Sequence, residues 1–404
     1  MGGSCVEVEH AGARLVLDLG LPLDAETDGP EQLPAVSGLD GNGADPISGV
    51  LISHPHLDHY GLLHHLSPDV PVGMGAAARS ILQAAAPFMY KPVPEHEGPT
   101  YQDRTPFSIG PFTITPYLVD HSAYDAYALL IEGEGKRLFY TGDIRGHGRK
   151  AGLFHALRTN PPEEVDALLM EGSSLKRLDN GARFPTEEDV EGQMAEAFRA
   201  AEGLAMVHAS AQNIDRIVSI LRACKRTGRR FVIDLYTAAV LEATENGNIP
   251  QSDWPDVALY VPERQRVQIK KGEWFDLLKR HSANRIFIED LCREPEKSVL
   301  LYRPLHSKDL ERAECLDGAS YIYSQWEGYW ERGSYDAVKD WLAEHGIPKT
   351  SIHTSGHASP ADLQALVAGL APKKLVPIHS FNPERYPELF PNVEAHGDGE
   401  WWPV

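Results

Sequence analysis

Cysteine is scarce in this chain of 404 residues, and long apolar runs are absent. The four cysteines, Cys5, Cys224, Cys292 and Cys315, include no CxxC pair. We therefore expect reduced and mostly buried thiols, as in cytoplasmic proteins. No apolar run approaches the roughly 18 residues that a membrane span requires, and the first residues lack the basic and apolar segments of a signal peptide. These absences predict a cytoplasmic protein without a membrane partner.

Positive charge is also in short supply. Lysine and arginine total 38 residues against 58 acidic residues, which gives a formal net charge of -20. A protein that coats nucleic acid without specificity would be basic, so this balance argues against broad duplex binding. It leaves room for a nuclease, because bound divalent ions and a local basic groove can hold phosphate inside an acidic shell.

What the sequence does contain is a dense group of metal-binding side chains. The hexapeptide His54-Pro55-His56-Leu57-Asp58-His59 carries three imidazoles and one carboxylate. The apolar run 49–53 before it predicts a buried strand that ends where these side chains begin. His54 and His56 can then face one ion, while Asp58 and His59 turn to a second. The alternative is a histidine-rich surface loop without a ligand.

Three further residues follow predicted strands later in the chain. His121 is a third ligand for the first ion, His379 completes the second, and a carboxylate at Asp143 can bridge both. Each has a simpler reading, since a histidine after a strand is more often structural and Asp143 fits a turn. Their order after the hexapeptide favours the ligand reading. Asp18 either orients a ligand imidazole or caps a turn. The expected cofactor is a pair of divalent ions, Zn²⁺ first and Mn²⁺ second, bound by His54, His56, Asp58, His59, His121, Asp143 and His379.

Hydrophobic periodicity divides the chain into parts of different character. The first part alternates like β-strands and has few predicted helices. From about residue 185, helices at 186–201 and 213–227 alternate with apolar strands, which predicts a parallel sheet covered by helices. The strands expected in the two parts lie at 13–18, 112–119, 126–132, 137–141 and 165–171, and at 204–208, 231–233, 285–288 and 320–323.

Metal-ligand types return near residue 350, where His353 and His357 precede His379. The simplest arrangement is one metal-binding domain made of residues 1–190 and 350–404. A second α/β domain, residues 191–349, is then inserted between its halves. A helix at 362–370 and a strand at 375–378 fit the space between His357 and His379.

At this point the sequence resembles the β-CASP branch of the metallo-β-lactamase superfamily, whose members include ribonuclease J-like RNA- and DNA-processing nucleases. The hexapeptide matches the HxHxDH motif of the superfamily. Further matches are His121-Ser122, the segment 141–145, the acidic motif ending at Glu171, the segment Ser355-Gly356-His357-Ala358, and Pro377-Ile378-His379. The resemblance implies an αββα sandwich with an inserted α/β β-CASP domain.

The resemblance also implies roles for residues beyond the metal ligands. His357 would stabilise the transition state or act as a general acid, and Glu171 would hold its protonated form. Asp58 joins them as a catalytic residue, because losing the second ion removes the activated water. Ser355, Ser210 and Asn213 would contact substrate phosphate; for Ser210 and Asn213 the alternative is plain helix capping.

We therefore expect a two-metal hydrolase that cleaves phosphodiester bonds of RNA or single-stranded DNA, with that nucleic acid as its partner. A homodimer is one expected assembly. The alternative is a metallo-hydrolase of a small molecule, such as a nucleotide, ester or thioester, that uses the same dinuclear site. Glu171 and the segment 355–358 favour the nuclease.

Overall fold

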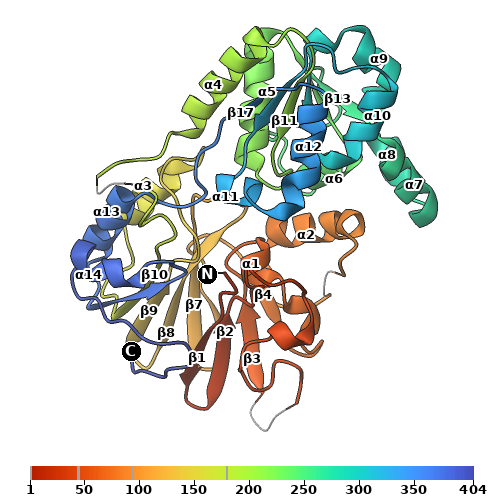
Figure 1. The fold of residues 1–404 in the computed structure, drawn as a ribbon. Coiled ribbons are helices and arrows are strands. Elements are labelled where there is room, and N and C mark those ends of the chain that lie inside the picture. The colour runs from red at the N-terminus through yellow and green to blue at the C-terminus, as the bar shows by residue number, and fades with distance from the viewer. Residues whose placement is uncertain (1, 43–45, 93–94, 179–180) are drawn as a thin grey trace. The chain divides into compact units, whose positions relative to one another are not determined.

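A computed structural model describes residues 2–42, 46–92, 95–178 and 181–404 of the chain. The chain forms two compact units. The first contains Met1–Ala86, Tyr90–Phe184 and Gly356–Val404, and the second contains Pro87–Met89 and Pro185–Ser355. Figure 1 labels the helices and strands of both units.

The first unit contains two β-sheets. The five-stranded sheet has the order β1 (Val6–His10), β2 (Ala13–Leu17), β3 (Ile47–Leu51), β4 (Val72–Gly75) and β5 (Thr100–Tyr101). The six-stranded sheet has the order β18 (Lys374–Ile378), β10 (Ala167–Glu171), β9 (Lys136–Tyr140), β8 (Tyr127–Gly133), β7 (Phe112–Leu118) and β6 (Phe107–Ile109).

Five helices accompany these sheets: α1 (Leu57–Tyr60), α2 (Ala76–Met89), α3 (Ala151–Thr159), α13 (Pro360–Leu370) and α14 (Tyr386–Leu389). In Figure 1, α13 and α14 lie outside the sheet that contains β10. One apolar cluster, which includes Leu17, Leu51, Ile114 and Leu129, joins the two sheets. Separate clusters join each sheet to its helices, through Leu168 and Leu366 on one side and through Val50 and Leu82 on the other. These layers confirm the expected αββα sandwich.

Strand direction explains how distant parts of the sequence meet. β10 pairs in parallel with both β9 and β18, while β8 is antiparallel to both β9 and β7. The strands β7, β9, β10 and β18 therefore all run the same way, and their carboxyl ends share one edge of the sheet. His121, Asp143, Glu171 and His379 are located at or shortly after these four ends.

The second unit is built on a seven-stranded sheet in which every neighbouring pair is parallel. Its order is β14 (Arg285–Ile286), β13 (Val257–Tyr260), β12 (Arg230–Ile233), β15 (Ser298–Leu301), β11 (Ala205–His208), β16 (Ser320–Tyr323) and β17 (Lys349–Ser351). Its helices are α4 (Glu187–Ala200), α5 (Ile214–Thr227), α6 (Leu235–Glu242), α7 (Glu263–Gly272), α8 (Phe275–Arg280), α9 (Ile288–Arg293), α10 (Ser307–Arg312), α11 (Glu327–Trp330) and α12 (Asp336–Glu344).

Local signals account for the ends of several of these helices. Thr186 begins α4 with a capping box, since its hydroxyl accepts from the Asp189 backbone N–H and Asp189 accepts in return. Gly228 ends α5 in the left-handed conformation, with φ of 68°. The expected strand at 285–288 is only half right, because α9 begins at Ile288. There the Asp290 carboxylate accepts from the Phe287 backbone N–H at 3.0 Å and favours a helix start.

The cysteine expectation is wrong for one pair. Cys292 and Cys315 form a disulfide, with their Cα atoms 5.0 Å apart. They are 23 residues apart in sequence, so no local motif predicts the bond. Folding of the chain brings the two side chains together. Cys5 and Cys224 are free thiols, half-buried and buried respectively.

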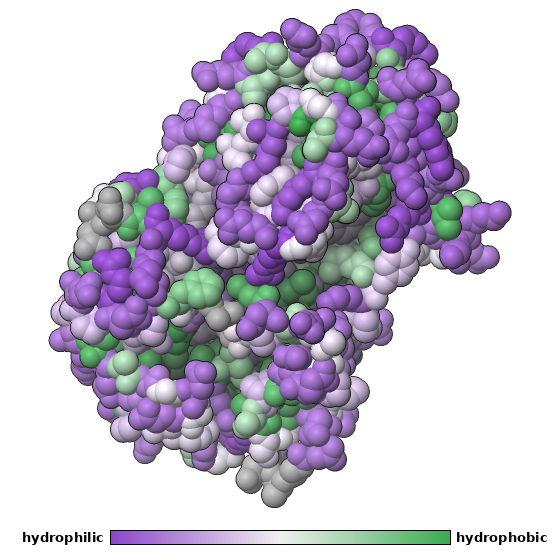
Figure 2. Space-filling view, in the orientation of Figure 1, coloured by the Kyte–Doolittle hydropathy of each residue, from purple (hydrophilic) through white to green (hydrophobic). Residues whose placement is uncertain are grey.

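The molecular surface in Figure 2 is mainly hydrophilic, with apolar atoms in scattered patches. Individual large apolar side chains are exposed, among them Phe275, Phe381 and Trp401. Within the described residues, no helix is both long enough and apolar enough to cross a membrane.

Candidate metal centre and active site

The Asp143 carboxylate lies at the centre of a group of imidazoles in the first unit. Its oxygens are 3.3 Å from His59 Nε2, 3.6 Å from His54 Nε2, 3.8 Å from His379 Nε2 and 3.9 Å from His121 Nε2. Asp143 is only 2% exposed to solvent, and His54, His59 and His121 are even less exposed. Residues from three separate segments of the chain, 54–59, 121 and 379, thus direct ring nitrogens at one buried carboxylate.

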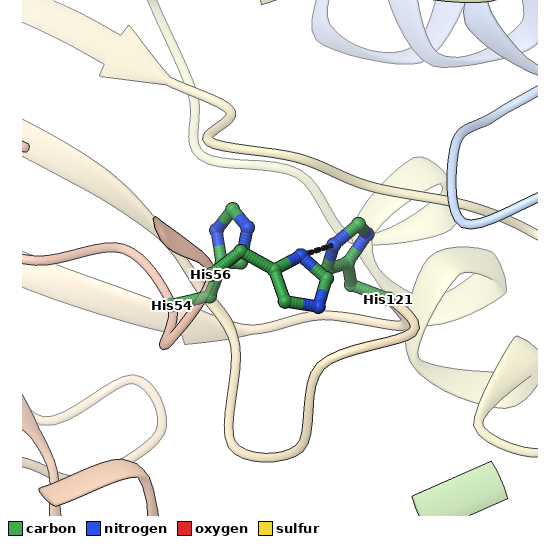
Figure 3. Close-up of side chains that lie close together, drawn as sticks. All are labelled: His54, His56 and His121. Carbon is green, nitrogen blue, oxygen red and sulfur yellow. Dashed lines mark hydrogen bonds between the residues drawn. The ribbon is translucent and has the colours of Figure 1, made fainter. Parts of the chain in front are cut away.

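Three of these histidines form a group of their own. His54 and His56 come from the loop between β3 and α1, and His121 follows β7. Figure 3 shows that the three rings face one another. His56 Nδ1 and His121 Nε2 are 3.2 Å apart, and one ring nitrogen from each of the three lies within 4.8 Å of the others. Such a set can hold a divalent cation.

A second group combines a carboxylate with two imidazoles. Asp58 Oδ2 is 3.6 Å from His379 Nε2 and 4.0 Å from His59 Nε2. Asp58 and His59 lie on the short helix α1, while His379 directly follows β18 and has a left-handed backbone with φ of 45°. The ligand atoms of this group also lie within 4.8 Å of one another. The structure therefore brings all seven predicted ligands together, in two neighbouring groups around Asp143.

Hydrogen bonds beneath the two groups fix the orientation of the rings. The buried Asp18 carboxylate accepts from His59 Nδ1 at 2.7 Å and from the Ser53 hydroxyl at 2.8 Å. Because the only hydroxyl hydrogen of Ser53 is used there, its oxygen accepts from His54 Nδ1, 3.0 Å away. The Nε2 atoms of His54 and His59 are then left to face Asp143. Of the two readings of Asp18, the geometry matches the one in which it orients an imidazole.

The polar atoms at the centre test whether metal ions fit here. Within the described part of the chain, His54 Nε2, His59 Nε2, His121 Nδ1, Asp143 Oδ1 and His379 Nε2 are buried and have no hydrogen-bond partner. Burying a polar atom without a partner costs free energy. Four of these atoms, all except His121 Nδ1, lie close to one another at the centre and are consistent with a cation that satisfies them, so the residues present fit divalent metal ions.

The protonation of these groups follows from their surroundings. Burial lowers the pKa of His54 and of His121 well below the usual range, and it lowers the pKa of His56 to about 4. These rings are neutral near pH 7, which is the form that binds metal. Burial opposes ionisation of Asp143, but the charges of His379, His59 and His357 outweigh it and hold its pKa well below the usual range.

His357 and Glu171 form a pair beside the same carboxylate. His357 Nδ1 is 3.0 Å from Glu171 Oε2 and 3.7 Å from Asp143 Oδ2. Burial alone would lower the pKa of His357, but the Glu171 charge, the Asp143 charge and the hydrogen bond to Glu171 raise it to about 8. Since a carboxylate only accepts, His357 Nδ1 donates to Glu171 and is not available to bind a metal.

Backbone contacts fix both members of this pair. Glu171 is fully buried at the end of β10, and its two oxygens accept from the backbone N–H groups of Ile144 and Ser173, each at 3.2 Å. The N–H group of Ala358 donates to the Ile144 carbonyl at 2.6 Å. A Cβ atom on Gly356 would lie 2.6 Å from Ser122 Oγ, so a larger residue there would displace the Ser122 hydroxyl.

The predicted phosphate-contacting residues belong to the second unit. Asn213 caps α5, because its side chain accepts from the Arg216 backbone N–H at 3.1 Å. The Ser210 hydroxyl is exposed and accepts from the Gln212 backbone N–H at 3.2 Å. Ser355 is buried, at 5% exposure. These local contacts match the capping alternative for Asn213, and contact with phosphate stays a prediction for all three residues.

Sequence reasoning missed several residues that support the site. Ser4 contacts His379, and Ser53 and Tyr140 contact Asp18, through tertiary hydrogen bonds for which no motif gives a signal. The buried Asp120–Arg145 ion pair, with an N–O distance of 3.2 Å, joins the loop of His121 to the loop of Asp143. The sequence could have indicated this pair, because Asp120 directly precedes His121 and Arg145 ends the matched segment 141–145.

Comparisons with known proteins were consistent with this geometry. Residues 23–207 match the family model of the beta-lactamase superfamily domain. The chain is 23% identical to a ribonuclease J of Sinorhizobium meliloti, over 82% of this chain and 57% of the relative. It is 26% identical to a ribonuclease J of Mycobacterium tuberculosis, over 94% of this chain and 66% of the relative.

The chain thus spans roughly two thirds or less of the length of these two curated relatives, at 66% and 57%. Among solved structures, a crystal structure of a protein of unknown function from Enterococcus faecalis matches with a TM-score of 0.77. That match has 22% identity and covers 98% of this chain and 94% of the other, which shows a shared fold. These comparisons show similarity to a beta-lactamase superfamily domain over residues 23–207 and to ribonucleases J over most of the chain.

Proposed function

We propose that this protein is a metal-dependent phosphodiesterase that cleaves RNA or single-stranded DNA. The observation that carries the proposal is the His357–Glu171 pair, which faces the same Asp143 carboxylate as the two groups of metal-ligand types. A similarity to ribonucleases J that extends over most of the chain, including both units, supports a nucleic-acid substrate.

The metallo-β-lactamase fold implies divalent metal ions, and we propose two of them. His54, His56 and His121 would hold one, Asp58, His59 and His379 the other, and Asp143 would lie between them. Imidazole with carboxylate suits Zn²⁺, with Mn²⁺ as the second choice. When bound, the ions supply positive charge for phosphoryl oxygens and make water acidic enough to attack near pH 7.

The protein's own residues then orient the reacting groups. Asp18 and Ser53 hold the rings of His59 and His54 so that both Nε2 atoms face Asp143. Preorganised rings need no rearrangement when the ligand arrives. Asp58 is half-buried at the edge of the group, so its loss would open the second ion site and remove catalysis with it.

His357 supplies the proton in this proposal. Glu171 accepts from Nδ1 and keeps the ring charged near neutrality, which leaves Nε2–H to stabilise a phosphoryl oxygen or to protonate the leaving oxygen. The pKa of about 8 suits this role, because the acid form is populated at pH 7 and can still release its proton.

The second unit, Pro87–Met89 and Pro185–Ser355, contains the residues 191–349 predicted as the inserted β-CASP domain and would serve in that role. Ser210 and Asn213 lie where β11 leads into α5, and Ser355 lies just before Gly356. Hydroxyl groups and free N–H groups at the first turn of α5 are suited to an anion, so we propose that this unit contacts the phosphate backbone.

The direct test is to incubate the purified chain with end-labelled single-stranded RNA and DNA, with Zn²⁺ or Mn²⁺ and with a chelator control. We expect metal-dependent cleavage of RNA, DNA or both. No cleavage of either polymer, together with hydrolysis of a nitrophenyl ester or a thioester, would replace the nuclease with the small-molecule hydrolase.

A further inference from the structure

Ser4 contacts two members of the second group of metal-ligand types, Asp58 and His379. Its hydroxyl oxygen lies 2.9 Å from His379 Nδ1. Its backbone N–H donates to the carbonyl oxygen of Asp58 at 3.0 Å, and its own carbonyl accepts from the Gly20 N–H at 3.0 Å. One residue therefore joins the segment before β1, the loop after β2, helix α1 and the end of β18.

The contact with His379 determines which ring nitrogen faces the centre. His379 Nε2 is buried without a hydrogen-bond partner and lies 3.6 Å from Asp58 Oδ2 and 3.8 Å from Asp143 Oδ1. For Nε2 to offer its lone pair to a cation, Nδ1 must carry the hydrogen. The Ser4 oxygen is placed to accept that hydrogen and thus to select this tautomer.

The backbone around Ser4 leaves this residue little freedom. A Cβ atom on Gly20 would lie 1.7 Å from the Asp58 carbonyl oxygen and 2.8 Å from the Ser4 nitrogen, so three backbone segments meet there at closest approach. Gly2 forms an isolated antiparallel bridge with Pro22, which holds the preceding residues in place. Ser4 is therefore held by main-chain contacts, and its hydroxyl is free to act on His379.

In the first group, the hydroxyls that contact ring nitrogens come from residues adjacent in sequence: Ser53 is 3.0 Å from His54 Nδ1, and Ser122 is 3.5 Å from His121 Nε2. His379 differs because it follows β18 with a left-handed backbone and is far in sequence from the other ligands. Its ring has to be oriented by a residue from another segment. In the described structure, the hydrogen bond observed at its ring nitrogens is the one between Nδ1 and the Ser4 hydroxyl oxygen.

We infer that Ser4 is a positioning residue for the second metal ion: it fixes the His379 tautomer and holds the backbone of Asp58. The inference rests on the proposed dinuclear site and adds a residue to it. Removing the hydroxyl would weaken the ion held by Asp58, His59 and His379 about 10–100-fold, the usual effect of losing such a hydrogen bond. The ion held by His54, His56 and His121 would keep its affinity.

The test measures metal affinity rather than activity. Wild type, Ser4→Ala and Ser4→Thr are loaded with Zn²⁺, dialysed against a graded series of chelator concentrations and analysed for bound zinc. Ser380→Ala is the matched control, because the Ser380 hydroxyl is adjacent to His379 in sequence but donates to the Gly172 carbonyl at 3.1 Å. Thermal unfolding of each metal-free variant reports on the fold.

We expect Ser4→Ala to lose one of two ions at a chelator concentration 10–100-fold below that needed for wild type, with Ser4→Thr and Ser380→Ala close to wild type. Wild-type affinity for both ions in Ser4→Ala would overturn the inference while leaving the dinuclear site intact. Equal weakening of both ions, or a Ser4→Thr variant as weak as Ser4→Ala, would also overturn it. A wild-type protein that binds no zinc would instead overturn the proposed function.

Discussion

Each unit buries a cluster of polar and charged side chains, and the two clusters differ in how far their hydrogen bonds are satisfied. In the second unit Arg216 is fully buried, and the Glu187 carboxylate accepts from it twice, at 3.0 and 3.2 Å, while the Ser324 carbonyl accepts at 2.9 Å. In the first unit, buried nitrogens of His54, His59 and His379 face Asp143 and have no hydrogen-bond partner among the described residues.

The difference separates structural from functional burial. The Arg216–Glu187 pair is hydrogen-bonded within the protein and joins α4 to α5, so it needs no ligand. Buried donors and acceptors that converge without partners are costly unless a ligand satisfies them. Function in this protein is therefore to be sought where the polar groups are incomplete.

The largest effect is expected from removing a ligand of the second group. Asp58→Ala or His59→Ala should abolish hydrolysis and lower the metal content from about two ions per chain to one or none. The metal-free fold should change little for Asp58→Ala, whose side chain is already partly exposed. Metal analysis, turnover assays and circular dichroism test this, and near-wild-type turnover in either variant would contradict the two-metal mechanism.

The next effect concerns the pair that faces Asp143 without belonging to the metal ligands. His357→Ala should retain both metals and lose about 10²–10⁴ in rate, the usual worth of a positioned acid or base. Glu171→Gln should share much of this loss, and the double variant should lose no more than His357→Ala, because the pair acts as a unit. Single-turnover cleavage of a labelled oligonucleotide measures all three; an unchanged rate in His357→Ala removes its catalytic role.

Disrupting the buried Arg216–Glu187 pair of the second unit should change the stability of the protein but not its metal content. Glu187→Gln leaves the buried Arg216 charge without its partner and should cost about 3–5 kcal/mol of unfolding free energy. The double variant Arg216→Met/Glu187→Leu should recover much of that loss, because it removes both charges. Urea unfolding curves are the measurement, with metal content unchanged. A double variant no more stable than Glu187→Gln would show that burial of the pair does not explain the cost.

The smallest effect is a displacement of the pH profile. The active form of His357 carries a proton, so the rate should fall as pH rises through its pKa. Glu171→Gln removes the negative charge that raises the pKa of His357, and the alkaline limb should therefore move to lower pH by about one unit. Cleavage rates measured at about ten pH values between roughly 6 and 10 would reveal this displacement. An alkaline limb that does not move would mean that a group other than His357 controls it.

Local patterns explain why much of this molecule could be predicted. The strand Phe112–Leu118 alternates in burial over most of its length, whereas the apolar run 127–131 is buried throughout. His121, Asp143 and His379 could be grouped because they follow strands, and the sheet gives those strands one direction. The expectation that few helices interrupt the first part overlooked α2, whose buried face rests on Ile81 and Leu82 within an alanine-rich segment.

Contacts that depend on the folded chain could not be predicted in the same way. Tyr140 donates to Asp18 across 122 residues, and Ser4 reaches His379 across 375. Neither contact follows from spacing or periodicity, because a serine or tyrosine hydroxyl at such a position can form hydrogen bonds with many different groups. The Cys292–Cys315 disulfide is of the same kind.

The pairing of β10 with β18 sets a condition on the synthesis of the protein. Glu171 lies opposite Ile378, so β10, which is synthesised before most of the second unit, can pair with β18 only after that unit has been synthesised. While the ribosome is still translating the intervening residues, the nascent chain already carries the hexapeptide but has neither His379 nor a neighbour for the open side of β10. A chain released early would therefore have an incomplete sheet without the last proposed ligand, and the proposed dinuclear site cannot form before residue 379 has been added.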